Sequence, residues 1–222
     1  VIDLTPAAFA ALHAQVMAVE IERYGGSAQY PPDVLLAGRR PLLQYPAEIL
    51  EATAANPNSI GVALLDRVSG RVVGYALGSP LENHDEMGVR DDPGLGDNTT
   101  LYLQAMAVSP QLKNQAEVEG LVLDAFRARA EWLGFVSLSA LIESRVVEAG
   151  PAWLKAATVA ETIENYMQSG VQFVYLRSSL VAPPTEGCPM PGLDRPAPIL
   201  VGGRWEAPGS GVIRETLNPA TG

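Results

Sequence analysis

Hydrophobic and polar positions along the first part of the chain follow a helical period. Apolar residues recur every three or four positions within residues 4–25, where Thr5 and Pro6 favour a helix start and Gly25 favours its end. A proline-punctuated stretch leads to a second apolar segment, which predicts a short helix over residues 47–55. The chain therefore opens with two helices of unequal length.

The next segments change to the shorter period of β-strands. Residues 59–81 contain two apolar runs joined at Ser69 and Gly70, a pattern that predicts a hairpin. Residues 82–100 are acidic and rich in turn-forming residues, which indicates a long loop. Residues 101–108 are apolar enough to form a strand that is buried on both faces.

A third helix follows a turn at Pro110 and ends at Gly134, and residues 135–143 then predict a strand. The order strand, helix, strand predicts a βαβ unit with a right-handed crossover, whose helix begins at the carboxyl end of the first strand. The apolar stripe of this helix consists of Val118, Leu121, Val122, Ala125, Phe126, Trp132 and Leu133.

The last part of the folded region predicts a helix over residues 156–170 and a strand over residues 171–179. Only that one strand is visible before the prolines begin, so we expect an open sheet edge, covered by residues 197–205 or by a neighbouring chain. The proline-rich residues 181–198 predict a semi-rigid linker, which separates a domain of residues 1–180 from residues 199–222.

Composition and charge exclude several classes of function. The net charge of −10, with fifteen Lys and Arg residues in no dense stripe, excludes nucleic acid as a partner. No apolar run approaches the ~20 residues that a membrane span needs. Cys188 is the single cysteine, so it cannot form an internal disulfide, and we expect a reducing, cytoplasmic setting. The sequence contains only two histidines, His13 and His84, and these with Cys188 do not have the spacing of a zinc site.

Over roughly residues 1–180, the succession of elements resembles the GNAT N-acetyltransferase superfamily. Two short stretches carry the resemblance, "MAVSP" at 106–110 and "YMQSGV" at 166–171. The resemblance implies an α/β (α+β) fold, a mixed central sheet flanked by helices with an extended C-terminal tail, and acyl transfer from acetyl-coenzyme A to a small-molecule amine. By resemblance, Tyr166 is the general acid that protonates the leaving thiolate. The backbone of Met106, Ala107 and Val108 contacts the pantetheine arm.

The family's pyrophosphate-binding turn has the pattern Gln or Arg, two variable residues, Gly, one variable residue, then Gly or Ala. Backbone amides there must approach a pyrophosphate closely. Two registers are open in this chain, and Val118 stands on a glycine position in both. The candidate cofactor-binding residues of the two registers are Lys113, Gln115, Ala116 and Gly120.

Two glutamates flank this turn and leave two interpretations open. A carboxylate about 5 Å from a phosphate charge costs on the order of 3 kcal/mol at an effective dielectric constant of ~20, so Glu117 and Glu119 can weaken acetyl-coenzyme A binding. Alternatively, Val118 is the first core residue of its helix and both glutamates complement the helix dipole. The turn is therefore degenerate under the first interpretation and purely structural under the second.

Three further features carry alternatives. Glu143 ends a strand and is a candidate general base, or a solvated strand-end carboxylate. Tyr166 is the candidate acid, or a ring packed under the sheet. The acidic loop can attract a cationic amine, or it is simply solvated. The acidic residues of the loop are Glu82, Asp85, Glu86, Asp91, Asp92 and Asp97.

Residues 199–222 resemble the beginning of the aldehyde dehydrogenase superfamily, through "GRW" in an expected hairpin and "NPATG" in an expected turn. That family's catalytic residues would lie downstream, so we expect the parent to be a fusion whose dehydrogenase chemistry lies outside this chain. Two functions remain open for residues 1–180. One is an N-acyltransferase, and the other is a non-catalytic module that packs with the dehydrogenase, or with a second copy, for assembly or regulation.

Overall fold

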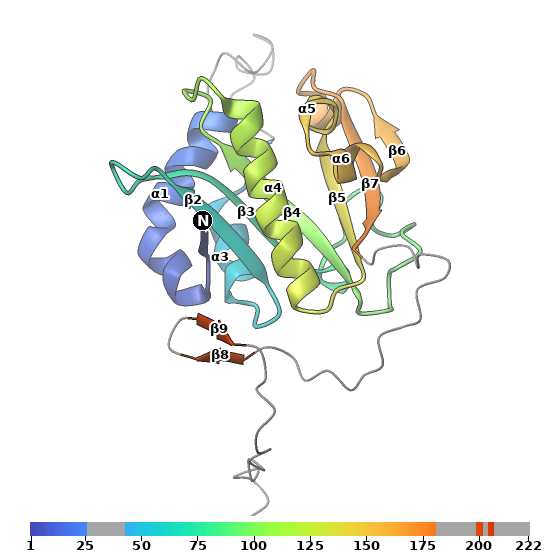
Figure 1. Cartoon of the computed structure of the whole chain (residues 1–222). Helices are drawn as coiled ribbons and strands as arrows, with labels where there is room; N and C mark the ends of the chain where they lie inside the picture. The colour runs from blue at the N-terminus through green and yellow to red at the C-terminus, as the bar shows by residue number, and fades with distance from the viewer. Residues whose placement is uncertain (26–42, 181–198, 202–203, 207–222) are drawn as a thin grey trace, which may run out of the picture. The chain divides into compact units, whose positions relative to one another are not determined.

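The structure, a computed structural model, describes residues 1–25, 43–180, 199–201 and 204–206 (Figure 1). These fall into two compact units, 1–182 and 183–222, and each is described by itself. The described part of the first unit contains a seven-stranded mixed sheet in the order β1-β2-β3-β4-β5-β7-β6. The strands are β1 (Ile2–Asp3), β2 (Ile60–Leu65), β3 (Val72–Pro80), β4 (Thr100–Val108), β5 (Ser137–Glu143), β6 (Thr158–Ile163) and β7 (Phe173–Ser179).

Helices cover both faces of this sheet. The helices are α1 (Pro6–Tyr24), α3 (Ala47–Ala55), α4 (Gln115–Trp132), α5 (Ser144–Ala149) and α6 (Ala152–Lys155), with short 3₁₀ turns η2 (Leu81–Asn83) and η3 (Tyr166–Gln168). Alternate residues of β3 separate two cores, since Tyr75 and Leu77 pack with α1 and α3, whereas Ala76 packs with α4. Figure 1 shows α4 lying across one face. The predicted α/β class is confirmed.

Local signals in the sequence account for the first elements. The Thr5 side chain accepts a hydrogen bond from the backbone N–H of Ala8 at 3.2 Å, which caps α1, and Pro6 occupies the first turn. The predicted hairpin is β2–β3, with Gly70 at a φ of +68° in its turn. The predicted βαβ unit is β4–α4–β5, whose two strands pair in parallel. These predictions are confirmed.

The predicted helix over residues 156–170 is wrong. Residues Thr158–Ile163 form strand β6, and η3 follows it. Because β6 pairs antiparallel with β7, the predicted open edge at β7 is wrong as well, and residues 197–205 are not needed to cover it. The short helices α5 and α6 occupy a stretch that the sequence analysis left unassigned.

The apolar stripe of α4 is only partly buried. Val118, Val122 and Phe126 lie in the core, as predicted. Trp132 and Leu133, near the end of the helix, are 58% and 47% exposed, and Leu121 is 50% exposed. The helix thus buries a narrower stripe than the sequence predicts.

The described part of the second unit is a two-stranded antiparallel hairpin, β8 (Ile199–Val201) and β9 (Arg204–Glu206). It confirms the hairpin expected around Trp205. The predicted linker over residues 181–198 and the "NPATG" turn at 218–222 lie outside the described residues. In the parts of the chain that the structure describes, no helix combines the length and hydropathy needed to cross a bilayer.

Candidate functional site

The central feature of the first unit is a divergence between two parallel strands. β4 and β5 pair from Thr100 opposite Ser137 to Leu103 opposite Ala140, and both strands then continue without pairing to each other. On its other edge, β4 shifts register against β3 at this level, and Gln104 has no residue opposite it. Such a bulge bends a strand and redirects a side chain, so Gln104 marks the point where the sheet opens.

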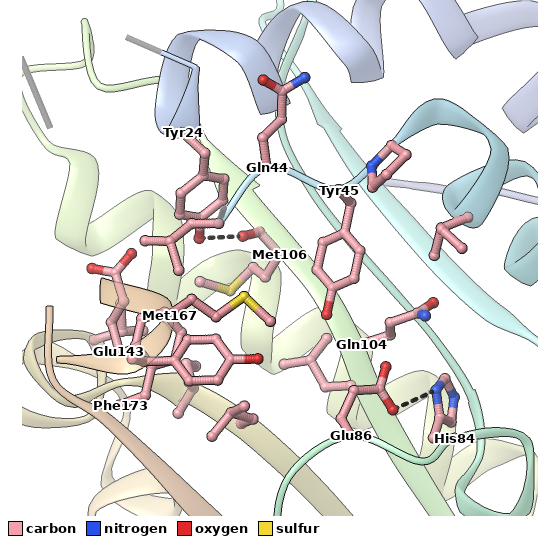
Figure 2. A pocket seen from close by; sticks show the side chains of 18 of the residues that line it. Tyr24, Gln44, Tyr45, His84, Glu86, Gln104, Met106, Glu143, Met167 and Phe173 are labelled. Carbon is pink, nitrogen blue, oxygen red and sulfur yellow. Dashed lines mark hydrogen bonds and ion pairs between the residues drawn. The ribbon is translucent and has the colours of Figure 1, made fainter. Parts of the chain in front are cut away.

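A cavity of about 440 Å³ lies at this divergence (Figure 2). Most of its wall is apolar or aromatic, with polar groups gathered at two places, a combination typical of a small-molecule site. The apolar and aromatic lining includes Tyr24, Tyr45, Leu103, Met106, Leu141, Ile142, Val146, Tyr166, Met167 and Phe173. The polar lining includes Gln44, Asn83, His84, Asp85, Glu86, Gln104 and Glu143.

The last turn of α1 holds the ends of both diverging strands. The Tyr24 hydroxyl donates to the backbone carbonyl of Met106 in β4 at 3.0 Å, as Figure 2 shows. The adjacent Arg23 forms an ion pair with Glu143 at the end of β5. Two neighbouring residues of one helix therefore fix the separation of β4 and β5 beyond their last pairing.

Glu143 is the centre of a chain of ion pairs. One carboxylate oxygen pairs with Arg23, and the other lies 2.7 Å from Nε of Arg145. Arg145 continues to the Glu119 carboxylate through contacts of 3.0 and 3.1 Å. The Glu143 side chain is only 6% exposed, so its interpretation as a solvated carboxylate is wrong. Each of its two oxygens is already engaged by a guanidinium group.

Tyr166 lies in η3, immediately before β7. Its ring packs against Phe173 with the ring centroids 4.8 Å apart, and the residue lines the cavity. Burial, and secondarily the negative charge of Glu86, raise the pKa of the Tyr166 hydroxyl. The backbone on either side is strained, because Asn165 and Met167 have φ values of +52° and +50°. Tyr166 therefore presents a protonated hydroxyl group from a constrained turn.

His84 and Glu86 form a second polar group in the cavity. The sequence analysis named Glu86 among the acidic loop residues that can attract a cationic amine, but it did not single out His84 or the pair. The Glu86 carboxylate lies 3.4 Å from Nδ1 of His84, and Nε2 of His84 lies 2.8 Å from the Ser79 hydroxyl. Burial by itself raises the pKa of Glu86. Hydrogen bonds from His84, from its own backbone and from Gln104 lower it, as does the charge of His84, and the net pKa of Glu86 is lowered. Glu86 is therefore an ionised carboxylate in the cavity wall. The signal available in the sequence was the i, i+2 spacing of these two residues in the acidic loop.

The predicted cofactor residues lie in two separate places. Of the β4 trio, Met106 lines the cavity, whereas Ala107 and Val108 are 1% and 0% exposed and lie in the two cores. Lys113, Gln115, Ala116 and Gly120, at the start of α4, do not line it. The structure thus brings Met106, Tyr166 and Glu143 together.

The start of α4 differs from a glycine-rich turn. The backbone N–H of Val118 is already bonded to the carbonyl of Asn114 at 3.1 Å, and its side chain is buried in the core. Glu117 is exposed and accepts a hydrogen bond from Asn114 at 3.1 Å. Glu119 turns inward to Arg145 and is also bonded by Gln115 at 3.0 Å. Val118 is therefore the first core residue of its helix, as the second interpretation of the turn expects.

Metal ligands do not cluster here. Within the described residues, no group of three or more His, Cys, Asp and Glu side chains is placed to hold a metal ion.

Known proteins similar to this chain are found by comparison of structures and not by comparison of sequences. No protein-family model and no curated protein matches the sequence. The fold is similar to a protein provisionally named a phosphinothricin N-acetyltransferase, with a TM-score of 0.50, 16% identity, and coverage of 77% of this chain and 95% of that one. It is equally similar to a provisionally named acetyltransferase from Acinetobacter baylyi ADP1, with a TM-score of 0.50, 13% identity, and coverage of 82% and 92%.

A further structure, an aminoglycoside 6'-N-acetyltransferase complexed with coenzyme A, matches with a TM-score of 0.46 and 11% identity, over 78% of this chain and 93% of that one. At these identities the likeness concerns the fold. The described residues among 1–180 have a fold like that of the GNAT acetyltransferases, a mixed sheet flanked by helices.

Proposed function

We propose that this protein transfers an acyl group from acyl-coenzyme A to a small amine in the cavity between β4 and β5. The observation that carries the proposal is Tyr166, a protonated hydroxyl group in the wall of a cavity that opens where two parallel strands part. The acetyltransferase fold of the chain supports the same reaction class, with acetyl-coenzyme A as the donor.

The reaction needs four events, and Tyr166 supplies the proton for one of them. The substrate ammonium first loses a proton to solvent, and the neutral nitrogen attacks the thioester carbonyl carbon. The C–S bond breaks, and the departing sulfur takes the proton of the Tyr166 hydroxyl. The nitrogen loses its second proton as the amide forms, and a proton returns through solvent to the Tyr166 phenolate, so that one proton is released in each turnover. General acid catalysis by a positioned group contributes about 10²–10⁴-fold to such a step.

The residues present fit the donor unevenly. The acyl end fits the apolar cavity beside Met106, where the strands have parted. By the resemblance to the family's turn, the diphosphate end would face the first turn of α4, where Val118 stands on a glycine position and Glu117 is an exposed acid. We therefore expect acetyl-coenzyme A to bind more weakly than it would to a glycine-rich turn, because the acidic side chain repels the diphosphate.

The test is an acetylation assay on the full chain, which follows thiol release from acetyl-coenzyme A with a panel of small primary amines. Tyr166→Phe should lower kcat by about 100-fold or more, with little change in acetyl-coenzyme A binding. Tyr45→Phe removes another hydroxyl group from the same cavity and serves as the matched control. Equal kcat values for Tyr166→Phe and wild type would rule out Tyr166 as the acid.

A second function is favoured by the ion-pair chain. Arg23, Glu143, Arg145 and Glu119 tie α1, β5, α5 and α4 together at the mouth of the divergence. A module whose elements are joined in this way could retain the fold without catalysing acyl transfer. It could then serve in the assembly or regulation of a fused aldehyde dehydrogenase. That fusion is itself a proposal, supported by the hairpin that includes Trp205. Absence of any turnover together with absence of acetyl-coenzyme A binding would favour this second function.

A further inference from the structure

We infer that the cavity selects an organic ammonium ion with an aromatic or branched apolar body, and that Glu86 pairs with its charge. This inference deepens the proposed function by naming the acceptor class, and it rests on that function only for the later transfer step. Binding of the amine itself requires no acyl donor.

The first step of the argument compares the carboxylates in the cavity wall. Glu143 has a guanidinium group on each oxygen, so its charge is already neutralised. Glu86 forms its ion contact with His84, and no Lys or Arg among the described residues pairs with it. Asp85, the neighbouring acid, is exposed. Among the described residues, Glu86 is therefore the partly buried cavity carboxylate that no Lys or Arg neutralises.

The second step concerns what surrounds Glu86. Glu86 lines the cavity, and Figure 2 shows its carboxylate turned toward His84, with the Gln104 side chain beside it and the hydroxyl end of Tyr45 facing the same group. Burial, and secondarily the negative charge of Glu86, raise the pKa values of Tyr45 and Tyr166, which line the same cavity. Tyrosine rings attract cations through their faces, so the carboxylate and the rings favour the same charge.

The third step concerns the body of the ligand. Most of the remaining wall is formed by apolar and aromatic side chains, among them Met106, Met167 and Phe173. Burying hydroxyl groups against such a wall leaves them without partners and costs free energy. An amine with an apolar body is therefore preferred over a polyhydroxylated amine.

His84 positions Glu86. Its ring lies between the Ser79 hydroxyl and the Glu86 carboxylate and packs on Tyr102 with the ring centroids 4.6 Å apart. Gly88, two residues beyond Glu86, has a φ of +87°, and a Cβ atom there would lie 2.4 Å from the Tyr175 ring. The loop that carries Glu86 is therefore held on both sides, which keeps the carboxylate in place before a ligand arrives.

The experiment is titration calorimetry of the full chain with 2-phenylethylamine, without acyl donor. The neutral isostere 2-phenylethanol and the polyhydroxylated amine glucosamine serve as comparison ligands. Wild type should bind 2-phenylethylamine at least about tenfold more tightly than either, because a charge-assisted hydrogen bond is lost with the first and hydroxyl groups are buried with the second.

Two variants complete the test. Glu86→Gln should weaken 2-phenylethylamine binding about tenfold or more, while Asp91→Asn, which removes the same charge from an exposed position of the same loop that does not line the cavity, should leave it unchanged. Circular dichroism melting of each variant checks that the fold is retained. Absence of amine binding at millimolar concentration, equal binding of the alcohol, or an unaffected Glu86→Gln variant overturns the inference. Amine binding without acetyl transfer would instead count against the proposed function alone.

Discussion

Glu20 is the buried acid that supports one wall of the cavity. It is 0% exposed and accepts hydrogen bonds from the Tyr75 hydroxyl at 2.6 Å and from the backbone N–H of Tyr45 at 2.8 Å. Burial raises its pKa from 4.5 to about 7, against the opposing effects of both hydrogen bonds and of Arg23. Glu20 therefore holds the backbone of Tyr45, a residue of the cavity wall.

The first stability prediction follows from this raised pKa. Between pH 4.5 and pH 7 the folded protein holds a proton on Glu20 that the unfolded chain releases, so the stabilisation is present at low pH and is lost as pH rises through the folded pKa. A shift of this size corresponds to about 3 kcal/mol. The free energy of unfolding, measured in urea, should decrease between pH 5 and pH 8. This decrease should be smaller for Glu20→Gln than for wild type. Equal decreases would contradict the account of Glu20.

Single residues that lie in a family motif could be predicted from the sequence, whereas the polar pair of the acidic loop could not. Tyr166 and Met106 were placed by their motifs, and both line the cavity. Glu143 was placed correctly at a strand end, but its two arginine partners come from α1 and α5, and spacing along the chain does not reveal such contacts. Glu86 and His84 lie in a segment without periodicity, so their i, i+2 spacing alone did not set Glu86 apart from the other acids of the loop.

At the scale of elements, the acidic loop between β3 and β4 is anchored more firmly than its composition suggests. The buried Asp92 carboxylate accepts hydrogen bonds from the Ser139 hydroxyl at 2.6 Å and the Tyr175 hydroxyl at 2.7 Å, and pairs with Arg177 at 3.2 Å. The interpretation of the loop as simply solvated is therefore wrong for Asp92. The anchor fixes the loop to β5 and β7.

The prediction for this element compares two adjacent aspartates. Asp92→Ala should lower the free energy of unfolding by about 3 kcal/mol, because it leaves Arg177 and two hydroxyl groups without their buried acceptor. Asp91→Ala, at an exposed position, should change it by less than about 0.5 kcal/mol. Denaturant unfolding monitored by fluorescence measures both. Similar values for the two variants would show that the loop is not anchored through Asp92.

The wrong assignment of residues 156–170 shows a segment where strand pairing overrides the local helix propensity. Alanine and glutamate in this stretch favour a helix, and the segment is almost fully exposed, so no apolar face marks it as a strand. Pairing with β7 decides the outcome, since Thr158, Val159, Thr162 and Ile163 are β-branched and suit an extended backbone. That pairing partner lies later in the chain, outside any local window.

At the scale of the whole molecule, the βαβ unit and the hairpin were predictable because both are specified by nearby residues. The divergence of β4 and β5 could not be predicted. It depends on the bulge at Gln104, and on the hydrogen bond and the ion pair that α1 forms with the ends of both strands. These long-range features create the cavity. The account of function therefore rests on packing that only the folded chain reveals.

The most direct measurement is a titration of acetyl-coenzyme A into the full ¹⁵N-labelled chain, monitored by amide chemical shifts. The account predicts saturable binding with a Kd below about 1 mM, with shifts concentrated at residues 104–108 and 141–143. A Glu117→Gln/Val118→Gly variant should bind more tightly, because bulk and negative charge are removed from the start of α4. No shifts at millimolar ligand, or shifts only outside the divergence, would contradict the claim that this cavity is an acyl-transfer site.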